Sequence, residues 1–208
     1  MKKQMTLFFI VTLVFLLLST NLIYSQVGIN KGIKVGLNMA TIAGDDNKIG
    51  GISPDSRMGF SAGGFIVLDL TVISIRPEIL YTMKGACYEA TVGNVKFDAT
   101  LKLDYLEVPI LLQYNLPLPG PVSPSLFAGP ALAFNLSAKV VEETSDTEED
   151  IEDVKSTDLG LVIGGGVVLN NKITLDVRLV MGLTSIDDSG ADDDVKNQVI
   201  SIMAGYMF

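Results

Sequence analysis

Residues 172–183 alternate between apolar and polar side chains, and this pattern constrains the fold more than any other feature of the chain. The odd-numbered positions are all apolar: Ile173, Leu175, Val177, Leu179, Met181 and Leu183. The even-numbered positions include Asp176 and Arg178, with Val180 as the one apolar exception. Successive side chains of a strand point to opposite sides, so a period of two indicates a β-strand. Because charges oppose an unbroken apolar face, the pattern favours a transmembrane strand between lipid and a polar lumen.

Seven further segments carry strand patterns, at residues 32–42, 57–68, 72–84, 101–115, 125–137, 158–169 and 197–208. Long connections at residues 43–56, 85–100, 139–157 and 184–196 alternate with short ones near 69–71, 116–122 and 170–171. Alternating long and short connections are typical of an outer-membrane barrel. We therefore predict an all-β fold: an eight-stranded antiparallel up-and-down transmembrane β-barrel with short periplasmic turns, long external loops and both ends on the periplasmic side. Less regular alternation before Tyr105 fits either a β-bulge or a stretch above the membrane.

Alternation alone does not say which face meets lipid, because a soluble lipocalin-like barrel would turn its apolar face inward. The polar face is rich in Gly and Ala, which suits the narrow interior of an eight-stranded barrel. Its charges can also pair, and we predict a lumen charge network of Arg76, Glu78, Glu107, Asp176 and Arg178. The glycines of residues 160–166 leave a doubt, since glycine opens space in a lumen.

The chain ends with aromatic residues at alternate positions, Tyr206 and Phe208. This pair resembles the C-terminal signal that the outer-membrane assembly machinery reads. The alternative is a chance aromatic end on a soluble strand. We predict that Tyr206 and Phe208 form an assembly signal, and that the barrel assembly machinery and outer-membrane lipid are partners of the chain.

The first residues have the layout of an export signal. Lys2 and Lys3 precede a short apolar run at residues 6–18, which is shorter than the roughly 20 residues that a spanning helix needs. We predict a cleaved signal peptide at residues 1–25 and one outer-membrane β-barrel domain at residues 26–208. The alternative is an uncleaved N-terminal membrane anchor.

Composition limits the chemistry. The chain has no His, which excludes Ser–His and Asp–His catalysis and every His-ligated metal site. Its one cysteine, Cys87, forms no internal disulfide and is expected unpaired in a loop. A net charge of −9 disfavours nucleic acid as a partner. We predict no catalytic residue, no cofactor and no specific metal site.

Acidic residues concentrate in two expected external loops. Residues 142–158 hold nine acids, and Asp187, Asp188, Asp192, Asp193 and Asp194 add five, so 14 of 24 lie there. Such runs are usually mobile and solvated. Loose binding of divalent cations is a weaker interpretation, because no EF-hand-like spacing is present.

Four segments resemble the PorT-like outer-membrane β-barrel proteins: residues 32–38, 76–81, 103–114 and 127–130. The most specific part is the tyrosine-leucine-glutamate-x-proline core at Tyr105, Leu106, Glu107 and Pro109. The resemblance implies an OmpA/OmpX-like eight-stranded barrel in the outer membrane, and it leaves the function open because a fold supports many functions. The namesake takes part in protein secretion.

Three functions remain open at this point. The first is a structural or interaction barrel whose lumen is plugged by charge pairs and whose acidic loops meet an unidentified surface or secretion partner. The second is a narrow pore for passive transport. The third, a lipid-modifying enzyme or surface protease, is disfavoured because only carboxylate or Ser–Lys chemistry is available without His.

Overall fold

The computed structural model describes residues 28–44, 52–70, 72–92, 95–142, 147–151, 153–188 and 195–208, and within these it describes only the backbone of residues 90–97. The expected signal peptide at residues 1–25 lies outside the described residues, as do Asp192, Asp193 and Asp194.

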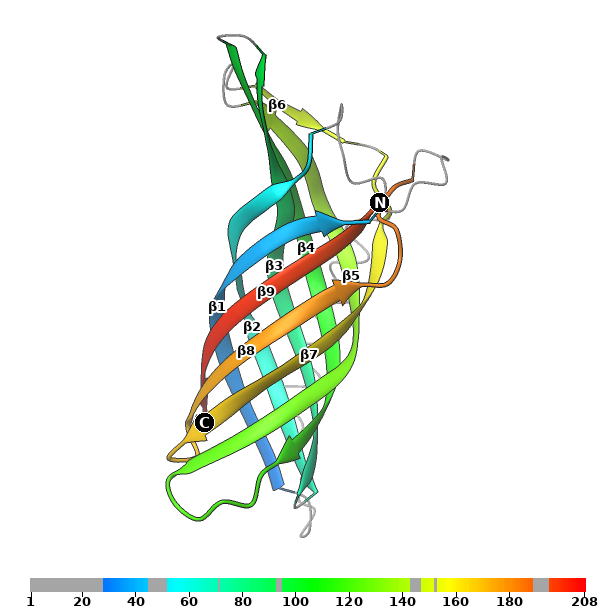
Figure 1. Cartoon of the computed structure of the whole chain (residues 1–208). Coiled ribbons are helices and arrows are strands. Elements are labelled where there is room, and N and C mark those ends of the chain that lie inside the picture. Colours follow the sequence, from blue (N-terminus) through cyan, green and yellow to red (C-terminus); the bar gives the residue numbers. More distant parts are fainter. Residues whose placement is uncertain are drawn as a thin grey trace.

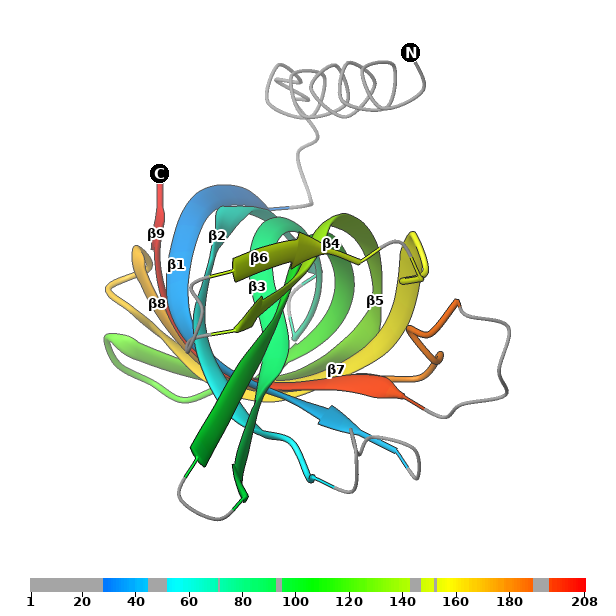
Figure 2. The same cartoon turned by 90° about the horizontal axis from the view of Figure 1, so that it is seen from above.

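The described residues form nine strands in one antiparallel sheet (Figure 1). They are β1 (Gly28–Ala43), β2 (Asp55–Leu70), β3 (Ile73–Val92), β4 (Val95–Asn115), β5 (Val122–Glu142), β6 (Thr147–Asp150), β7 (Thr157–Leu169), β8 (Ile173–Gly182) and β9 (Lys196–Met207). All but β6 pair in a ring that β1–β9 and β4–β5 pairing closes, as the view from above shows (Figure 2). The predicted eight-stranded barrel is confirmed.

Short turns and long connections lie at opposite ends of the barrel (Figure 1). At the short-turn end, Asn170 and Asn171 have φ angles of 50° and 57°, and the Lys172 N–H donates to the Leu169 carbonyl at 3.0 Å. Two consecutive positive φ angles make a type I′ hairpin turn, as the sequence predicts. Gly32 pairs with Met207, so β1 begins and β9 ends at this same end.

The long-connection end is more ordered than the sequence predicts. Residues 85–100 were expected to form a loop, but β3 and β4 continue as a hairpin until Val92 pairs with Val95. This segment is rich in β-branched and aromatic residues, which favour strands. Cys87 therefore lies on a strand, not in a loop. Strand β6 adds a further edge to β5, with Lys139 opposite Asp150.

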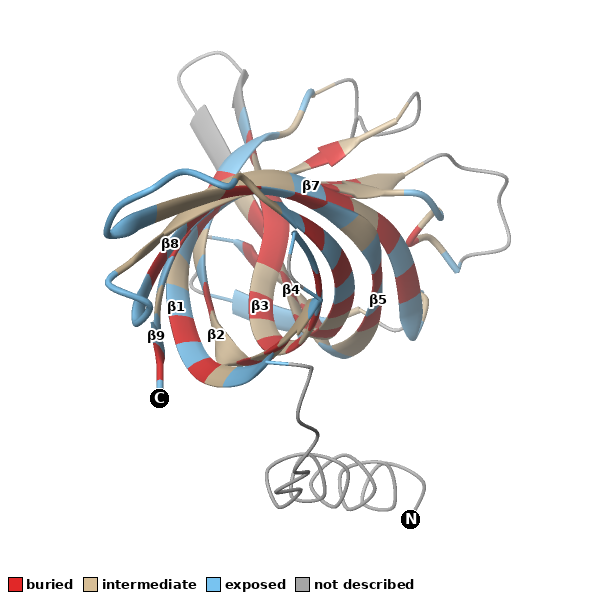
Figure 3. Cartoon of the chain, turned by 90° about the horizontal axis from the view of Figure 1, so that it is seen from below, coloured by how far each residue is buried: buried red, intermediate tan, exposed pale blue. Residues whose placement is uncertain are grey.

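The apolar residues of the barrel wall face outward, and the polar ones face inward (Figure 3). Leu37 and Ile202 are 64% and 66% exposed, whereas Lys34 and Arg178 are 2% and 3% exposed. A soluble barrel would have the opposite arrangement, so that alternative is wrong. No helix among the described residues is long and apolar enough to cross a membrane.

The irregularity expected near Tyr105 is present as a β-bulge. Asp104 pairs with Ser137 and Tyr105 pairs with Asn135, so Leu136 of β5 is the extra residue. The bulge increases local bend and twist, which is common near barrel rims. The sequence indicated the position, but the inserted residue belongs to the neighbouring strand.

Candidate functional site

Glu78 of β3 lies at the centre of a charge network that crosses the barrel lumen. Its carboxylate accepts hydrogen bonds from Lys34 Nζ of β1 at 2.8 Å and from Arg178 of β8 at 2.7 and 3.2 Å. Arg76 Nε is 3.0 Å from the same carboxylate. The Glu78 side chain has no exposed surface. Three cations from three strands therefore meet one buried anion.

Asp176 of β8 is the second anion of this network. Its Oδ2 lies 2.8 Å from Lys34 Nζ, 3.1 Å from Arg178 Nη2 and 3.3 Å from Arg76 Nη2. The Arg76 contacts are ion pairs without hydrogen-bond geometry. Each cation thus touches both carboxylates, which offsets the large cost of removing charges from water.

Aromatic rings support the cations of the network. The guanidinium carbons of Arg76 and Arg178 lie 4.3 and 5.4 Å from the ring centre of Phe127 on β5. Lys34 Nζ lies 4.6 Å from the ring centre of Phe65 on β2. Ring faces attract cations at these distances, so the side chains fill the lumen cross-section as well as balance charge.

A second network is centred on Lys84 of β3. Its Nζ lies 2.8 Å from Glu107 Oε2 and 3.9 Å from Asp158 Oδ2. Asp158 also accepts a hydrogen bond from the Asn197 amide at 2.9 Å, and the same amide donates to the Tyr105 hydroxyl at 3.4 Å. Together the two networks hold four cations and four carboxylates, each with an opposite charge within 4 Å.

The glycines of β7 do not leave open space. A Cβ atom on Gly164 would lie 2.5 Å from the Phe127 ring, and one on Gly166 would collide with Asp176. The missing side chains are therefore what lets Phe127 and Asp176 take their places in the lumen. The expectation that these glycines open a path is wrong.

Apolar side chains fill the outer mouth of the barrel. The buried members of this cluster are Ile42, Ala86, Tyr88, Leu103, Tyr105, Ala133, Ala138 and Ile186. Ile186 lies between β8 and β9, so a long connection folds back over the strands. Part of the acidic run is also bound: Lys102 and Lys139 each donate to Glu148 at 3.2 Å, and these hydrogen bonds lower the pKa of the Glu148 carboxyl.

Comparison with known proteins agrees with this architecture. The family model described as outer membrane protein beta-barrel domain matches residues 24–188. The chain belongs to this family. Its members are outer-membrane proteins, so the chain is an outer-membrane protein too. No curated protein sequence matches it.

Solved structures of other barrels share the fold of this family member. Neisserial surface protein A is 17% identical with a TM-score of 0.51, over 87% of this chain and 99% of that one. The attachment invasion locus protein of Yersinia pestis, Ail, is 16% identical with a TM-score of 0.46, over 86% and 98%. OprG from Pseudomonas aeruginosa is 15% identical with a TM-score of 0.42, over 88% and 94%. Identities this low speak to the fold alone.

In this outer-membrane barrel, four of the five predicted lumen residues meet in one network: Arg76, Glu78, Asp176 and Arg178. Glu107 ion-pairs instead with Lys84. Sequence reasoning missed the roles of Lys34 and Lys84, although both lie on polar faces. It counted Asp158 with the acids in or at the rim of a loop, whereas Asp158 is 3% exposed and is bound inside the lumen.

The predicted aromatic pair lies on the outer surface of β9 and just beyond it, with Tyr206 48% and Phe208 64% exposed. Within the described residues, no group of three or more His, Cys, Asp or Glu side chains could hold a metal ion. Asp187 and Asp188 belong to the described part, and the other three aspartates of that run do not.

Proposed function

We propose that this outer-membrane barrel is closed to transport, non-enzymatic, and holds an acidic external sheet and loops for a structural or interaction role. The carrying observation is the network around Glu78, which ties β1, β3 and β8 together across the lumen with all side chains at most 3% exposed. An eight-stranded barrel is only wide enough for its side chains to fill, so such a network acts as a plug.

The absence of enzymatic activity rests on chemistry. The chain has no His, and the eight lumen charges are all engaged with opposite charges. A general acid or base must be free to reach a substrate proton, and the lumen carboxylates point at cations instead. A lipid-hydrolysis assay on the purified barrel is expected to give no turnover.

Planar-bilayer recordings test the plug. The wild-type barrel is expected to give no large, steady single-channel current, because charged and aromatic side chains fill the lumen. Glu78→Ala/Asp176→Ala, which removes both anions of the network, is expected to raise current events above the wild-type level by loosening the plug. Glu148→Ala, outside the lumen, is the matched control. Large steady currents through the wild type would favour the narrow pore.

The partners belong to this proposal as well. Tyr206 and Phe208 face outward on the last strand, where the assembly machinery could bind them. Replacing both with Ala is expected to reduce the folded barrel recovered from outer membranes, while Tyr114→Ala, an equally exposed tyrosine on β4, should not. Equal losses from both variants would point to a general loss of lipid contact.

Export and secretion complete the proposal. Cleavage after residue 25 predicts that the mature protein begins at Gln26, which N-terminal sequencing of the purified barrel checks. The PorT-like resemblance of residues 103–114 makes a protein secretion component the natural class of partner. Cross-linking from the external sheet in intact cells tests for such a partner.

A further inference from the structure

A separate cavity lies among the external strands and connections, outside the lumen networks. It has a volume of about 310 Å³ and is lined mainly by Tyr88, Leu101, Ile151, Val154, Ile186 and Val195. These side chains come from the β3–β4 hairpin, the segment after β6 and both ends of the β8–β9 connection. The volume is at the lower end of the roughly 300–1,000 Å³ range of small-molecule sites.

The base of this cavity is dry. Tyr88 and Ile186 belong to the buried cluster of the outer mouth, and Leu101, Ile151, Val154 and Val195 pack against it. Apolar side chains therefore separate the cavity from Lys84 and Glu107 below. It is a pocket with a closed floor, not the entrance of a channel.

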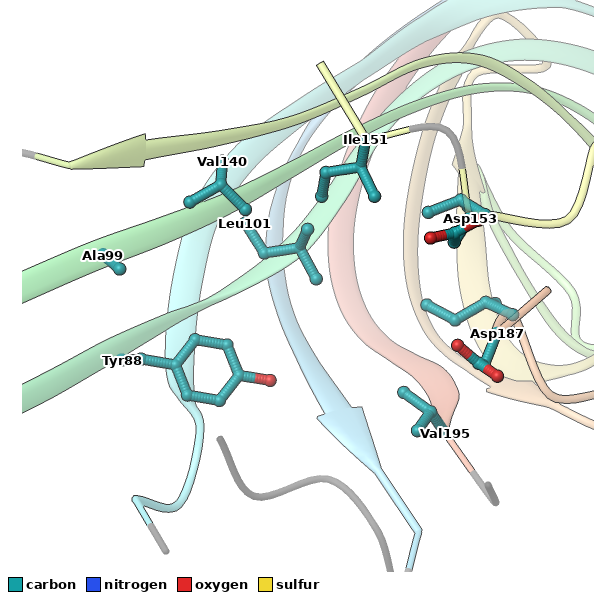
Figure 4. Close-up of a pocket in the computed structure, with 10 residues that line it drawn as sticks. Tyr88, Ala99, Leu101, Val140, Ile151, Asp153, Asp187 and Val195 are labelled. Atoms are coloured by element: carbon teal, nitrogen blue, oxygen red, sulfur yellow. The ribbon is translucent and has the colours of Figure 1, made fainter. Parts of the chain in front are cut away.

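The charged residues that line the pocket are both acidic, Asp153 and Asp187. Figure 4 shows them together on one side, facing the Tyr88 ring and Leu101 across the cavity. Their backbones are tied: the Asp188 N–H donates to the Asp153 carbonyl at 3.1 Å, and Val154 forms a β-bridge with Asp187. The two carboxylates are thus held at the edge of an apolar surface.

We propose that this pocket binds a small amphipathic cation, with the apolar body against Tyr88, Leu101 and Ile186 and the ammonium group beside Asp153 and Asp187. Burial of the apolar part supplies affinity, and the two carboxylates select the charge. The site goes beyond the closed-barrel function, because it holds whether or not the lumen conducts.

Three probes with the same six-carbon chain separate charge from apolar burial. Hexyltrimethylammonium, hexan-1-ol and hexanesulfonate are titrated by calorimetry into the full barrel in zwitterionic lipid nanodiscs, with empty nanodiscs as the blank. The cation is expected to bind one site per chain, about fivefold or more tighter than hexanol, and the sulfonate least. Absence of cation binding, or equal binding of cation and alcohol, would overturn the proposal.

Two sets of variants locate the site. Asp153→Asn/Asp187→Asn is expected to weaken cation binding about fivefold or more and leave hexanol unchanged. Asp150→Asn/Asp188→Asn, which removes the same charge from acids that do not line the pocket, is the control. Ala99→Phe fills the cavity from its wall and should abolish binding of both. Cation binding that persists in Ala99→Phe, or that falls equally in both Asn pairs, would show surface attraction only.

Folding of each variant is checked by its unboiled gel mobility. Because the bilayer recordings address only the lumen, the pocket and the plug can fail separately.

Discussion

Glu78→Ala is expected to lower the free energy of unfolding of the barrel by about 3–5 kcal/mol, the range for breaking a buried ion pair. Glu78 contacts Lys34, Arg76 and Arg178 within 3.0 Å. Without it, three cations share one carboxylate, Asp176, in a lumen whose side chains are at most 3% exposed. The cost comes from cations left without a counter-charge away from water.

Urea unfolding of the barrel in lipid vesicles, followed by gel mobility and tryptophan-free far-UV dichroism, measures this effect. Glu148→Ala is a close control, because Glu148 also binds two lysines but at 3.2 Å and with a half-exposed side chain. Its loss should cost about 1 kcal/mol or less. Equal costs for the two variants would contradict the view that burial makes the Glu78 network important.

A double-mutant cycle shows whether the effect belongs to the network. Removing Arg178 together with Glu78 takes away one of the stranded cations. The double variant should therefore cost less than the sum of its single changes, which is the sign of coupled residues. Additive costs would mean that Glu78 and Arg178 act independently despite their 2.7 Å contact.

The sequence predicts the barrel well because its wall obeys a local rule. Alternation at residues 172–183 depends only on the pleat of one strand, and the Asn170–Asn171 turn depends only on two residues that tolerate positive φ. Both features were predicted correctly. The hairpin at residues 85–100 was missed because its ladder continues without a lipid-facing apolar side, which was the signal used for strands.

The lumen partners were harder to predict, because they depend on how the ring closes. Arg76 with Glu78, and Asp176 with Arg178, are two residues apart on one strand and follow from alternation. Lys34 meets Asp176 across 142 positions of sequence, and Arg178 meets Glu78 across 100. Such contacts follow from strand tilt and stagger, which a single sequence does not reveal. Glu107 was placed with the wrong partner for the same reason.

The lipid-facing wall gives the second large expected effect. Ile202→Arg should lower the free energy of unfolding by about 2–4 kcal/mol, as charges do near the middle of a transmembrane barrel. Ile202 is 66% exposed and is flanked on neighbouring strands by Leu37 and Val177, which are 64% and 55% exposed. An arginine there faces hydrocarbon with no counter-charge among these neighbours.

The same substitution near the external rim separates lipid from water. Leu183 follows β8, is 53% exposed and lies at the long-connection end, so Leu183→Arg should cost about 0–1 kcal/mol. Both variants are unfolded in urea from vesicles of one lipid composition. If the outer face met water, arginine would be harmless at both positions. A large cost at Ile202 with a small cost at Leu183 therefore measures where along the wall the membrane lies.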